Sequence, residues 1–474
     1  MYFFNFVSNF IQFYALLEFI VHLNILEMKK VIIIGNGIAG TTAARWIRKL
    51  SDYSIQIISD ESDYFFSRPA LMYVYMGHMR WQDIQVYEEH FWSKNKIELL
   101  NQTVIHINES DNSITLRNNT KLNYDILVIA TGSKTKFYDW PGLQFKGVSG
   151  LYFKSDLEYI EARSPKINHA VIVGGGLIGI ELAEMLITRG KQVTMLVRED
   201  SYWSNILPKE ESKMVSKHIL QHHVEIKFGT ELQEIFASES NEVSSIKLSS
   251  GEIINCEYIG IATGVSPNIE CLKHTNVKTN KGILVDKNLR TNVKNIYAVG
   301  DCAELQFANN GRKAIEAVWY SGRIMGEVVA HNICGIEMEY EQGIWFNSAK
   351  FFDIEYQVYG YVPAKAVEGV ESLFWQHESE DKSIRIVFDS RSNIVLGFNL
   401  MGVRFRHEVC DKWIRDKIEL EEVVQDISLA FFDPEFSRNY SSNIVDVYNA
   451  KFNTRIRAKV NSLNSVLRFL KIKA

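Results

Sequence analysis

The stretch Lys29–Ile47, KKVIIIGNGIAGTTAARWI, decides the fold of this 474-residue chain. Its first part, Val31–Ile34, is a short run of apolar β-branched residues, as expected for a parallel strand that is buried on both faces. Gly35, Gly37 and Gly40 follow with the spacing GxGxxG. The first glycine permits a tight turn, the second lets the backbone approach a pyrophosphate, and the third lets a helix pack on the strand. We therefore predict a strand, a tight turn and a helix whose N-terminal amides face a phosphate.

A second predicted strand follows this helix and ends in two acids, SIQIISDE at Ser54–Glu61. In dinucleotide-binding folds, an acid about 20 residues after the glycine turn binds a ribose hydroxyl. Asp60 is our first choice for this contact, and Glu61 is the reserve.

The same pattern returns at His169–Leu186, HAVIVGGGLIGIELAEML, where Gly174, Gly176 and Gly179 follow another strand. A single GxGxxG is weak, because many tight turns between a strand and a helix use glycine. Two copies, each with a strand before it and a helix after it, are a strong signal. The sequence therefore predicts two dinucleotide sites, and so two cofactors.

Two further apolar strands end in glycine turns: YDILVIATGS at Tyr124–Ser133 and IYAVGDCAE at Ile296–Glu304. The second places Asp301 at the carboxyl end of its strand. Doubly wound sheets bind their ligands at that end. Both segments are therefore predicted to lie beside a cofactor.

These ordered motifs resemble those of the two-dinucleotide-binding-domain flavoproteins, the pyridine-nucleotide:disulfide oxidoreductase superfamily, over residues 29–360. The resemblance implies an α/β fold with two Rossmann-like domains, the NAD(P)H domain inserted in the FAD domain, and an α+β C-terminal domain. It implies FAD and NAD(P)H as cofactors. The expected segments are an apolar N-terminal extension (1–27), the FAD domain in two parts (28–150 and 270–340), the NAD(P)H domain (151–269) and a C-terminal interface domain with a basic tail (341–474).

By the same resemblance, the first glycine turn holds the FAD pyrophosphate, the second binds NAD(P)H, and IATGVSPN at Ile261–Asn268 closes the inserted domain. Backbone at Val104 is expected beside the adenine. The residues implied to bind the two cofactors are Gly35, Gly37, Ile38, Ala39, Gly40, Asp60, Glu61, Arg68, Pro69, Val104, Ala130, Thr131, Gly132, Gly174, Gly176, Leu177, Ile178, Gly179, Glu181, Arg198, Gly264, Gly300 and Asp301.

The class of reaction is indicated by a missing cysteine. Members of the superfamily that reduce disulfides carry a CxxxxC pair, or one cysteine, on the helix after the second FAD strand. Here that region reads YFFSRPALMYVYMGHM, Tyr64–Met79. Its SRPAL resembles the branch that contains NADH:rubredoxin reductase, ferredoxin reductases and the flavin part of assimilatory nitrite reductase, in which hydride passes to flavin N5 and electrons leave singly.

We therefore expect an FAD-dependent NAD(P)H oxidoreductase that reduces a separate acceptor, and the acceptor that we expect is a small rubredoxin- or ferredoxin-like protein. Two alternatives stay open. One is an NADH dehydrogenase that reduces quinone or oxygen. The other is an NAD(H)-sensing flavoprotein that acts through protein partners, as the resemblance to apoptosis-inducing factor implies.

Glu181 is the expected catalytic residue, because it matches a glutamate that lies near the nicotinamide and flavin in relatives, often paired with a lysine. The position of that lysine is occupied here by Tyr73. Glu181 is then either unpaired with a raised pKa or paired with Arg68. The competing interpretation is an exposed acid in the first turns of a helix, stabilised by the helix dipole.

The choice between NADH and NADPH is open, with a slight lean to NADH. The segment VTMLVRED places Val197, Arg198 and Glu199 at the end of the relevant strand. Arg198 is suited to a 2′-phosphate, whereas Glu199 is suited to a 2′-hydroxyl.

Composition narrows the class further. A net charge of −5 argues against general affinity for nucleic acid. The five cysteines form no closely spaced pair, which is typical of a cytoplasmic protein without structural disulfides or a zinc cluster. Cys302 is expected to be a packed residue rather than a redox thiol. His218, His222 and His223 are expected to be surface histidines, because no carboxylate joins them at ligand spacing, so no metal is predicted.

The two termini differ from the rest of the chain. Residues 1–27 are apolar and aromatic but fit neither a secretory signal nor a clean membrane span, so we interpret them as an upstream extension, with a weak membrane contact as the alternative. After Asp446 only basic charges occur, and apolar residues recur at helical spacing from Ile456 to Leu470. This basic amphipathic helix is expected to pack on its own domain or on a dimer partner, in preference to a membrane surface or an acidic redox partner.

Overall fold

The computed structural model describes residues 28–308, 311–432, 435 and 437–459. These residues form two compact units, which we describe separately. The first unit comprises residues 28–134, 152–155 and 265–342, and the second comprises 135–151, 156–264 and 343–459. The N-terminal extension expected at 1–27 lies outside the described residues.

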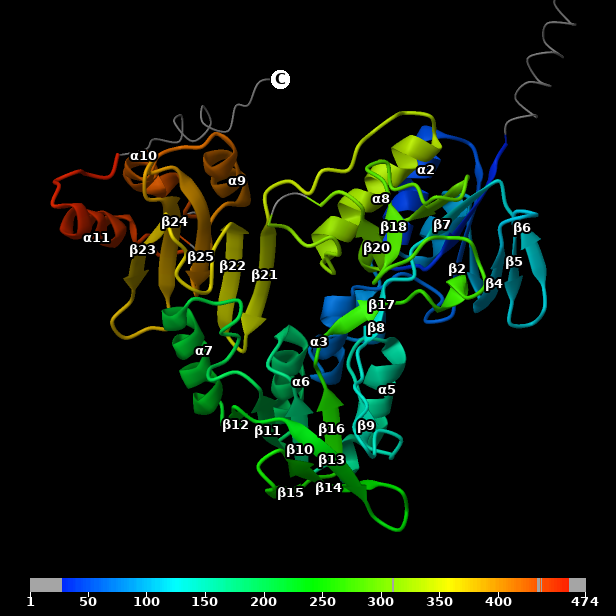
Figure 1. The fold of residues 1–474 in the computed structure, drawn as a ribbon, viewed down its shortest axis with the longest axis horizontal. Coiled ribbons are helices and arrows are strands. Elements are labelled where there is room, and N and C mark those ends of the chain that lie inside the picture. The colour runs from blue at the N-terminus through cyan, green and yellow to red at the C-terminus, as the bar shows by residue number, and fades with distance from the viewer. Residues whose placement is uncertain (1–27, 309–310, 433–434, 436, 460–474) are drawn as a thin grey trace, which may run out of the picture. The chain divides into compact units, whose positions relative to one another are not determined.

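A five-stranded parallel sheet forms the centre of the first unit (Figure 1). Its strands are apolar because they lie in one core with residues of neighbouring helices and of a small antiparallel sheet. Val31, Ile32 and Ile33 of the first strand are fully buried. In spatial order, the strands are β19 (Ile296–Ala298), β7 (Ile126–Ile129), β1 (Lys30–Ile34), β2 (Ser54–Ser59) and β3 (Ile97–Asn101).

Two helices pack closely beside this sheet, α2 (Ile38–Leu50) and α8 (Trp319–Ile333). A Cβ on Gly326 of α8 would lie 2.5 Å from the carbonyl oxygen of Ala39, so a glycine is needed where the helices cross. The smaller elements are α3 (Leu71–Tyr75), α4 (Glu89–Lys94), the antiparallel strands β4 (Val104–Asn108), β5 (Ser113–Leu116) and β6 (Lys121–Asn123), and the parallel pair β18 (Ile283–Val285) and β20 (Ala303–Leu305).

The second unit contains another parallel five-stranded sheet, built on the same plan. In both sheets the strand before the glycine turn lies in the middle, and the strand after the following helix lies beside it. In spatial order, the strands are β12 (Glu225–Phe228), β11 (Gln192–Val197), β10 (His169–Val173), β16 (Tyr258–Ile261) and β9 (Val148–Ser149).

The helices of this part are α5 (Lys154–Arg163), α6 (Leu177–Thr188) and α7 (Lys209–Gln221), and an antiparallel sheet is formed by β13 (Leu232–Ala237), β14 (Val243–Leu248) and β15 (Ile253–Asn255). Short strands β8 (Ser133–Thr135) and β17 (Val265–Pro267) pair where the chain passes between the units.

An antiparallel sheet follows in the second unit, with the order β21 (Phe346–Phe351), β22 (Ile354–Gly360), β25 (Val395–Met401), β24 (Ser383–Asp389) and β23 (Val370–Gln376). Helices α9 (His407–Arg415), α10 (Leu420–Gln425) and α11 (Ser441–Phe452) complete it. Together with the two parallel sheets, this confirms the predicted fold class: two Rossmann-like sheets and an α+β C-terminal part. The five-segment division of the chain stays a proposal.

The prediction of a continuous C-terminal helix is wrong in its first part. Helix α11 ends at Phe452, because Asn453 adopts a left-handed conformation with φ of 53°. The side chain of Asn449 then bonds the following backbone, accepting from the amide of Ile456 at 2.9 Å. Ile456 packs partly against the core of the C-terminal sheet. The rest of the predicted helix, residues 460–474, lies outside the described residues.

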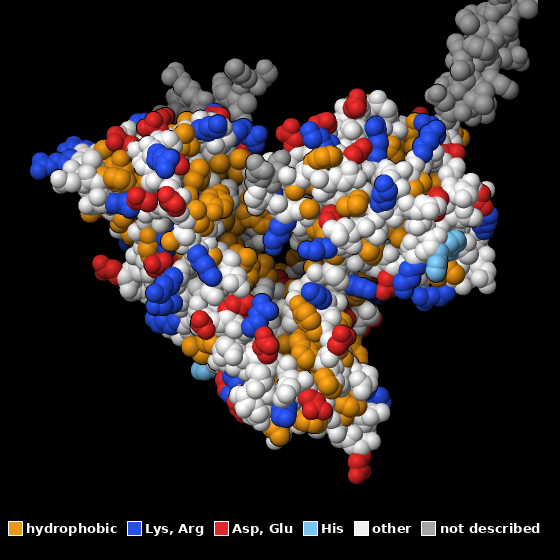
Figure 2. Space-filling view, viewed as in Figure 1, with side chains coloured by type: hydrophobic (Ala, Val, Ile, Leu, Met, Phe, Trp, Pro, Cys, Tyr) orange, Lys and Arg blue, Asp and Glu red, His pale blue; other side chains and the backbone are white. Residues whose placement is uncertain are grey.

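The surface carries both signs of charge, interspersed over the visible face (Figure 2). Within the part of the chain that the structure describes, no helix has the length and apolar character that a membrane crossing requires.

Candidate functional site

The first glycine turn has the geometry that the sequence pattern predicts. Gly35 has a φ of 109°, and a Cβ there would lie 2.2 Å from the carbonyl oxygen of Ala130. A Cβ on Gly40 would lie 2.1 Å from the carbonyl oxygen of Gly35. At Gly37, in contrast, an added Cβ would meet nothing within 4 Å. The outer glycines are therefore required by packing, whereas the middle one leaves space over the turn.

The second turn repeats this geometry. Gly174 has a φ of 119°, its Cβ would lie 2.3 Å from the carbonyl oxygen of Ala262, and a Cβ on Gly179 would lie 2.4 Å from that of Gly174. The nearest atom to a Cβ on Gly176 is 3.9 Å away. In both turns, the first and third glycines of the GxGxxG pattern leave no room for a side chain, whereas the middle glycine does.

Both helices that follow these turns begin without a side-chain cap and without an acid in the first turn. The first backbone amides of each helix therefore have no side chain to bind, and together with the positive end of the helix dipole they suit a phosphate. Residues Ile38, Ala39, Leu177 and Ile178 supply the first backbone amides of the two helices. The residues present therefore fit a pyrophosphate at each turn.

In the first unit, four side chains implied by the motifs or next to them form one connected group. Arg68 donates two hydrogen bonds to Glu61, at 2.8 and 2.6 Å, and a third to the carbonyl oxygen of Tyr152. The hydroxyl of Tyr152 donates to Asp301 Oδ2 at 3.3 Å and accepts from the amide of Ser133 at 3.1 Å. This group links the turn after β7 to the turn after β19, where FAD is implied to lie.

Burial sets the charges in this group. It raises the pKa of Asp301, although the Tyr152 hydroxyl and Arg68 oppose the shift. Burial works against the charge of Arg68, but the hydrogen bonds and negative charge of Glu61 outweigh it, so the pKa of Arg68 is raised. Because the Glu61 carboxylate also accepts from the amide of Lys154 at 3.0 Å, it is already engaged. Asp60, which is exposed just after β2, is the better candidate for a ribose hydroxyl.

The remaining residues implied for FAD lie at the ends of strands or in turns. Thr131 donates to the carbonyl oxygen of Asn268 at 2.6 Å, and Gly132 and Gly300 have φ of 66° and 75°. Val104 is buried at the start of β4, and Pro69 is exposed in a single helical turn after Ser67.

In the second unit, Glu181 lies on α6, four residues after the helix begins, and is partly buried. Burial, and then the charge of Glu184, raise the pKa of Glu181 to about 7, while Lys350 lowers it. Lys350 extends from β21 and binds Glu184 at 2.5 Å. In the described part of the chain, the Glu181 carboxyl group has no hydrogen-bond partner, which is unlike an exposed helix acid.

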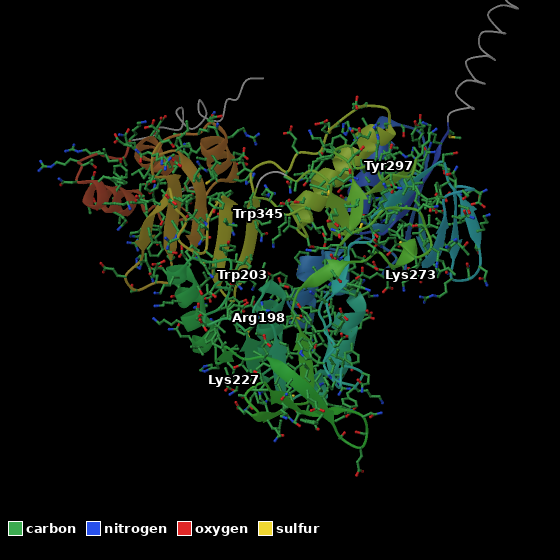
Figure 3. The ribbon with its side chains drawn as sticks, viewed as in Figure 1. Arg198, Trp203, Lys227, Lys273, Tyr297 and Trp345 are labelled. Atoms are coloured by element: carbon green, nitrogen blue, oxygen red, sulfur yellow. The ribbon has the colours of Figure 1, made fainter. Side chains whose placement is uncertain are left out.

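The strand end where the second ribose is implied to bind is followed directly by Arg198, and Trp203 comes five residues later in the chain (both labelled in Figure 3). The side chain of Arg198 is 71% exposed, 3.4 Å from Glu199. Glu199 also accepts from Asn205 at 2.8 Å. The guanidinium is therefore accessible, whereas the carboxylate already has partners. Gly264, the last residue of this unit before the chain leaves it, has a φ of 105° and open space around it.

The expectation that no carboxylate joins the histidines is wrong. His218 is buried, and its two ring nitrogens contact Asp353 and Asp381. His222 also contacts Asp353, whereas His223 is exposed. The two acids come from parts of the chain more than 130 residues away, so sequence spacing could not indicate them.

The five cysteines are poor nucleophiles. Cys302 is fully buried, and its thiol donates to the carbonyl oxygens of Val299 and Ile129 at 3.3 and 3.4 Å. Burial raises its pKa, and it raises those of Cys256 and Cys271 to about 12. Burial likewise raises the pKa values of Cys334 and Cys410. Cys302 is thus a packed residue, as expected from the sequence.

Comparison with known proteins identifies the family. The sequence model described as pyridine nucleotide-disulphide oxidoreductase matches residues 29–325, and the chain belongs to this family. It is an FAD-dependent NAD(P)H oxidoreductase.

Three proteins illustrate the similarity. A 5,5′-dehydrodivanillate O-demethylase ferredoxin reductase subunit from Sphingobium is 29% identical, over 69% of this chain and 81% of its own. An NAD(P)H coenzyme A polysulfide/persulfide reductase from Pyrococcus horikoshii is 30% identical, over 79% of this chain and 87% of its own. The structure of an NAD-dependent persulfide reductase from A. fulgidus shares the fold, with a TM-score of 0.78, 24% identity, and coverage of 90% and 83%.

Three residues near the implied sites were missed from the sequence. Tyr152 connects Asp301 to Ser133, and Tyr202 donates from its buried hydroxyl to the carbonyl oxygen of Gly176 at 2.9 Å. Lys350 influences Glu181 from a strand about 170 residues later in the chain. A lone tyrosine or lysine in a loop or strand carries no recognisable pattern, so only the fold reveals these contacts.

Proposed function

We propose that this protein transfers electrons from NAD(P)H, through FAD, to a small iron or iron–sulfur carrier protein. FAD, when bound, supplies the conversion between a two-electron donor and a one-electron acceptor. The residues of the chain position the two cofactors at the glycine turns, and Glu181 adjusts the charge beside the nicotinamide.

The observation that carries this proposal is that the chain offers no cysteine with the low pKa that a thiol relay needs. A thiol relay needs a thiolate, which forms only where the pKa of a cysteine is near or below the ambient pH. The pKa of every cysteine in this chain is raised by burial. The segment Tyr64–Met79, where thiol-using members of the superfamily carry their cysteine, has none. Reduced flavin is therefore expected to pass electrons directly to an external acceptor.

The similarity to the Sphingobium ferredoxin reductase subunit supports a protein carrier as that acceptor. The similarity to the Pyrococcus persulfide reductase covers a larger share of the chain, which makes reduction of sulfur compounds the second candidate. The two candidates differ in their need for a reactive thiol, and the absence of one favours the protein carrier.

We further propose that the carrier contacts the first turns of α8. Trp319, Tyr320 and Ile324 are exposed there, at 38%, 36% and 47%. Gly322, in the same turn, packs near Ile38 at the start of α2 and near Gly300. Exposed aromatic side chains are favoured at protein interfaces because they bury much surface at little entropic cost. Such a contact would place a carrier beside the implied FAD site.

Replacing Trp319 with alanine tests the acceptor assignment. With the FAD-loaded protein and NADH in excess, the variant should reduce a rubredoxin or a [2Fe–2S] ferredoxin about tenfold more slowly at low carrier concentration. Reduction of ferricyanide, which needs no docking, should change less than about twofold. Exposed Phe307 lies at 69% exposure outside α8, so Phe307→Ala is a matched control. Equal losses with both acceptors would contradict a docking role.

A further inference from the structure

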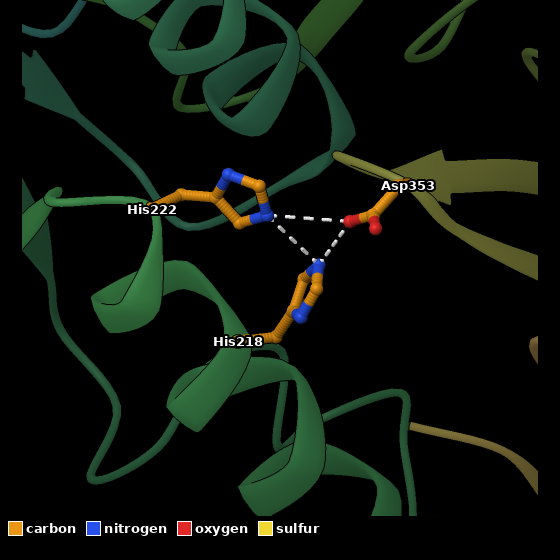
Figure 4. A group of neighbouring side chains, drawn as sticks. All are labelled: His218, His222 and Asp353. Atoms are coloured by element: carbon orange, nitrogen blue, oxygen red, sulfur yellow. Dashed lines mark hydrogen bonds and ion pairs between the residues drawn. The ribbon is translucent and has the colours of Figure 1, made fainter. Parts of the chain in front are cut away.

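The C-terminal end of α7 meets the turn between β21 and β22 in a cluster of side chains that electron transfer does not explain (Figure 4). His218 Nε2 lies 2.5 Å from Asp353 Oδ1, and His222 Nε2 lies 3.2 Å from the same oxygen. The two Nε2 atoms are 3.2 Å apart. Two imidazole nitrogens and one carboxylate oxygen therefore converge on one point.

The surroundings fix the orientation of both rings. His218 lies in the last turn of α7 and His222, four residues later, is the residue that caps this helix, so both side chains lie on the same side of its end. Asp381 Oδ2 lies 2.9 Å from His218 Nδ1, which suits an Nδ1–H donor and leaves the lone pair of Nε2 directed at the cluster. The ring of His222 stacks on Phe352, with centroids 4.2 Å apart and planes 4° apart. A carboxylate behind a ligating histidine is the usual support of a metal ligand.

Charge balance favours a cation at the point of convergence. When His218 carries its proton on Nδ1 and both rings are neutral, at most one proton lies between the two Nε2 atoms and the carboxylate oxygen of Asp353. The carboxylates of Asp353 and Asp381 bring two negative charges to the same cluster. A divalent cation neutralises both. Imidazole nitrogen and carboxylate oxygen are ligands that suit zinc and similar transition metals. We propose that His218, His222 and Asp353 bind a divalent transition-metal ion, Zn²⁺ foremost, with Asp381 orienting His218.

The distances are compatible with such an ion. Ligand atoms about 2.0–2.1 Å from a tetrahedral metal lie about 3.3 Å from one another. Two of the three separations are already 3.2 Å. The third must lengthen, and this requires little, because the side chain of Asp353 is 76% exposed on a turn. A solvent molecule can complete the coordination from that exposed side.

The ion would join the end of α7 to the turn between β21 and β22, and contacts from β21 continue to the glycine turn where NAD(P)H is implied to bind. The turn that carries Asp353 joins β22 to β21, and β21 supplies Lys350, which lowers the pKa of Glu181. Phe351 of the same strand packs against Tyr202, whose hydroxyl binds Gly176. A bound ion would therefore fix β21, the strand that carries Lys350 and Phe351, against the end of α7.

Metal binding is tested with the full-length FAD-loaded protein, freed of any histidine tag and of metal. Co²⁺ is the first probe, because the visible absorption bands of four-coordinate Co²⁺ lie at longer wavelength than those of oxidised flavin. We expect cobalt bands that saturate at about one ion per chain and disappear when Zn²⁺ is added. The absence of such bands in the wild-type protein would overturn the proposal, and no variant is needed for that result.

Variants then assign the ligands. Asp353→Asn and His222→Gln should each weaken Zn²⁺ binding by more than about tenfold, measured by competition with a chromophoric chelator. Asp381→Asn should weaken it less and keep the cobalt bands. The matched control is His223→Asn, since His223 is adjacent but exposed, and asparagine tolerates its φ of 62°. Equal affinity in all four variants would show adventitious binding and contradict the assignment, leaving the cluster as a hydrogen-bonded junction.

Discussion

At the scale of single residues, Glu181 lies where a change of charge near neutral pH is expected. Its pKa of about 7 results first from burial, then from Glu184, against the opposing charge of Lys350. The carboxyl group is therefore neutral below pH 7 and ionised above it. A nicotinamide gains positive charge as it donates hydride, so an ionised carboxylate beside it stabilises the transition state. We predict that flavin reduction by NAD(P)H accelerates as the pH rises through 7.

Two variants distinguish this role from a structural one. In Glu181→Gln the pH-dependent rise should disappear, and the rate at pH 8 should fall about tenfold. In Lys350→Met the midpoint should move to higher pH, because a positive charge that lowers the pKa is removed. Stopped-flow absorbance of the flavin measures both. A Glu181→Gln profile with the wild-type midpoint would show that another group titrates.

We predict that Arg198 sets how well the protein uses NADPH. Its exposed guanidinium is available for a 2′-phosphate, whereas Glu199 already bonds Asn205. We predict that Arg198→Ala lowers kcat/KM for NADPH about 10- to 100-fold, the worth of a charge-assisted hydrogen bond. With NADH it should change less than about threefold. Steady-state kinetics with both nucleotides provide the measurement, and equal losses would argue against a contact with the 2′-phosphate.

At the scale of elements, the two glycine turns provide matched substitutions. A side chain at Gly37 or Gly176 meets no close neighbour in the protein, and both residues have a negative φ that any amino acid adopts. We predict that Gly37→Val abolishes FAD binding, and that Gly176→Val retains FAD but blocks its reduction by NAD(P)H. Absorbance at 450 nm and nucleotide titration separate the two outcomes.

Gly179→Ala serves as the contrasting control for these substitutions. A Cβ there would lie 2.4 Å from the carbonyl oxygen of Gly174, so the fold itself should lose more than about 2 kcal/mol of stability. Loss of FAD in Gly176→Val with normal NAD(P)H binding would show that the two motifs have been assigned in reverse.

These elements also show how far the sequence alone could be interpreted. The two parallel sheets could be predicted from local pattern, because a buried β-branched run followed by a glycine turn indicates a strand, a turn and a helix within about 20 adjacent residues. The end of α11 did not follow, because a left-handed Asn453 interrupts a hydrophobic pattern that continues beyond it. The histidine cluster was missed for another reason: Asp353 and Asp381 reach it only after the C-terminal sheet has folded. Contacts between distant segments leave no spacing in the sequence.

At the scale of the whole molecule, the family and the two turns predict one FAD per chain. The purified protein should be yellow, and FAD released by denaturation should equal the protein concentration within about 20% after reconstitution. A folded protein that takes up no FAD would contradict the assignment of the first turn.

The central claim is that electrons leave the flavin without a thiol. The most direct measurement compares wild-type protein with Cys302→Ser, both FAD-loaded and supplied with NADH, on ferricyanide, a rubredoxin, coenzyme A disulfide and a persulfide. Serine should cost only about 1–2 kcal/mol of stability at this buried position. We predict that both proteins reduce ferricyanide and rubredoxin at rates within about twofold of each other, and that neither turns over the sulfur compounds. Turnover of coenzyme A disulfide or persulfide by the wild type, lost in Cys302→Ser, would contradict the account.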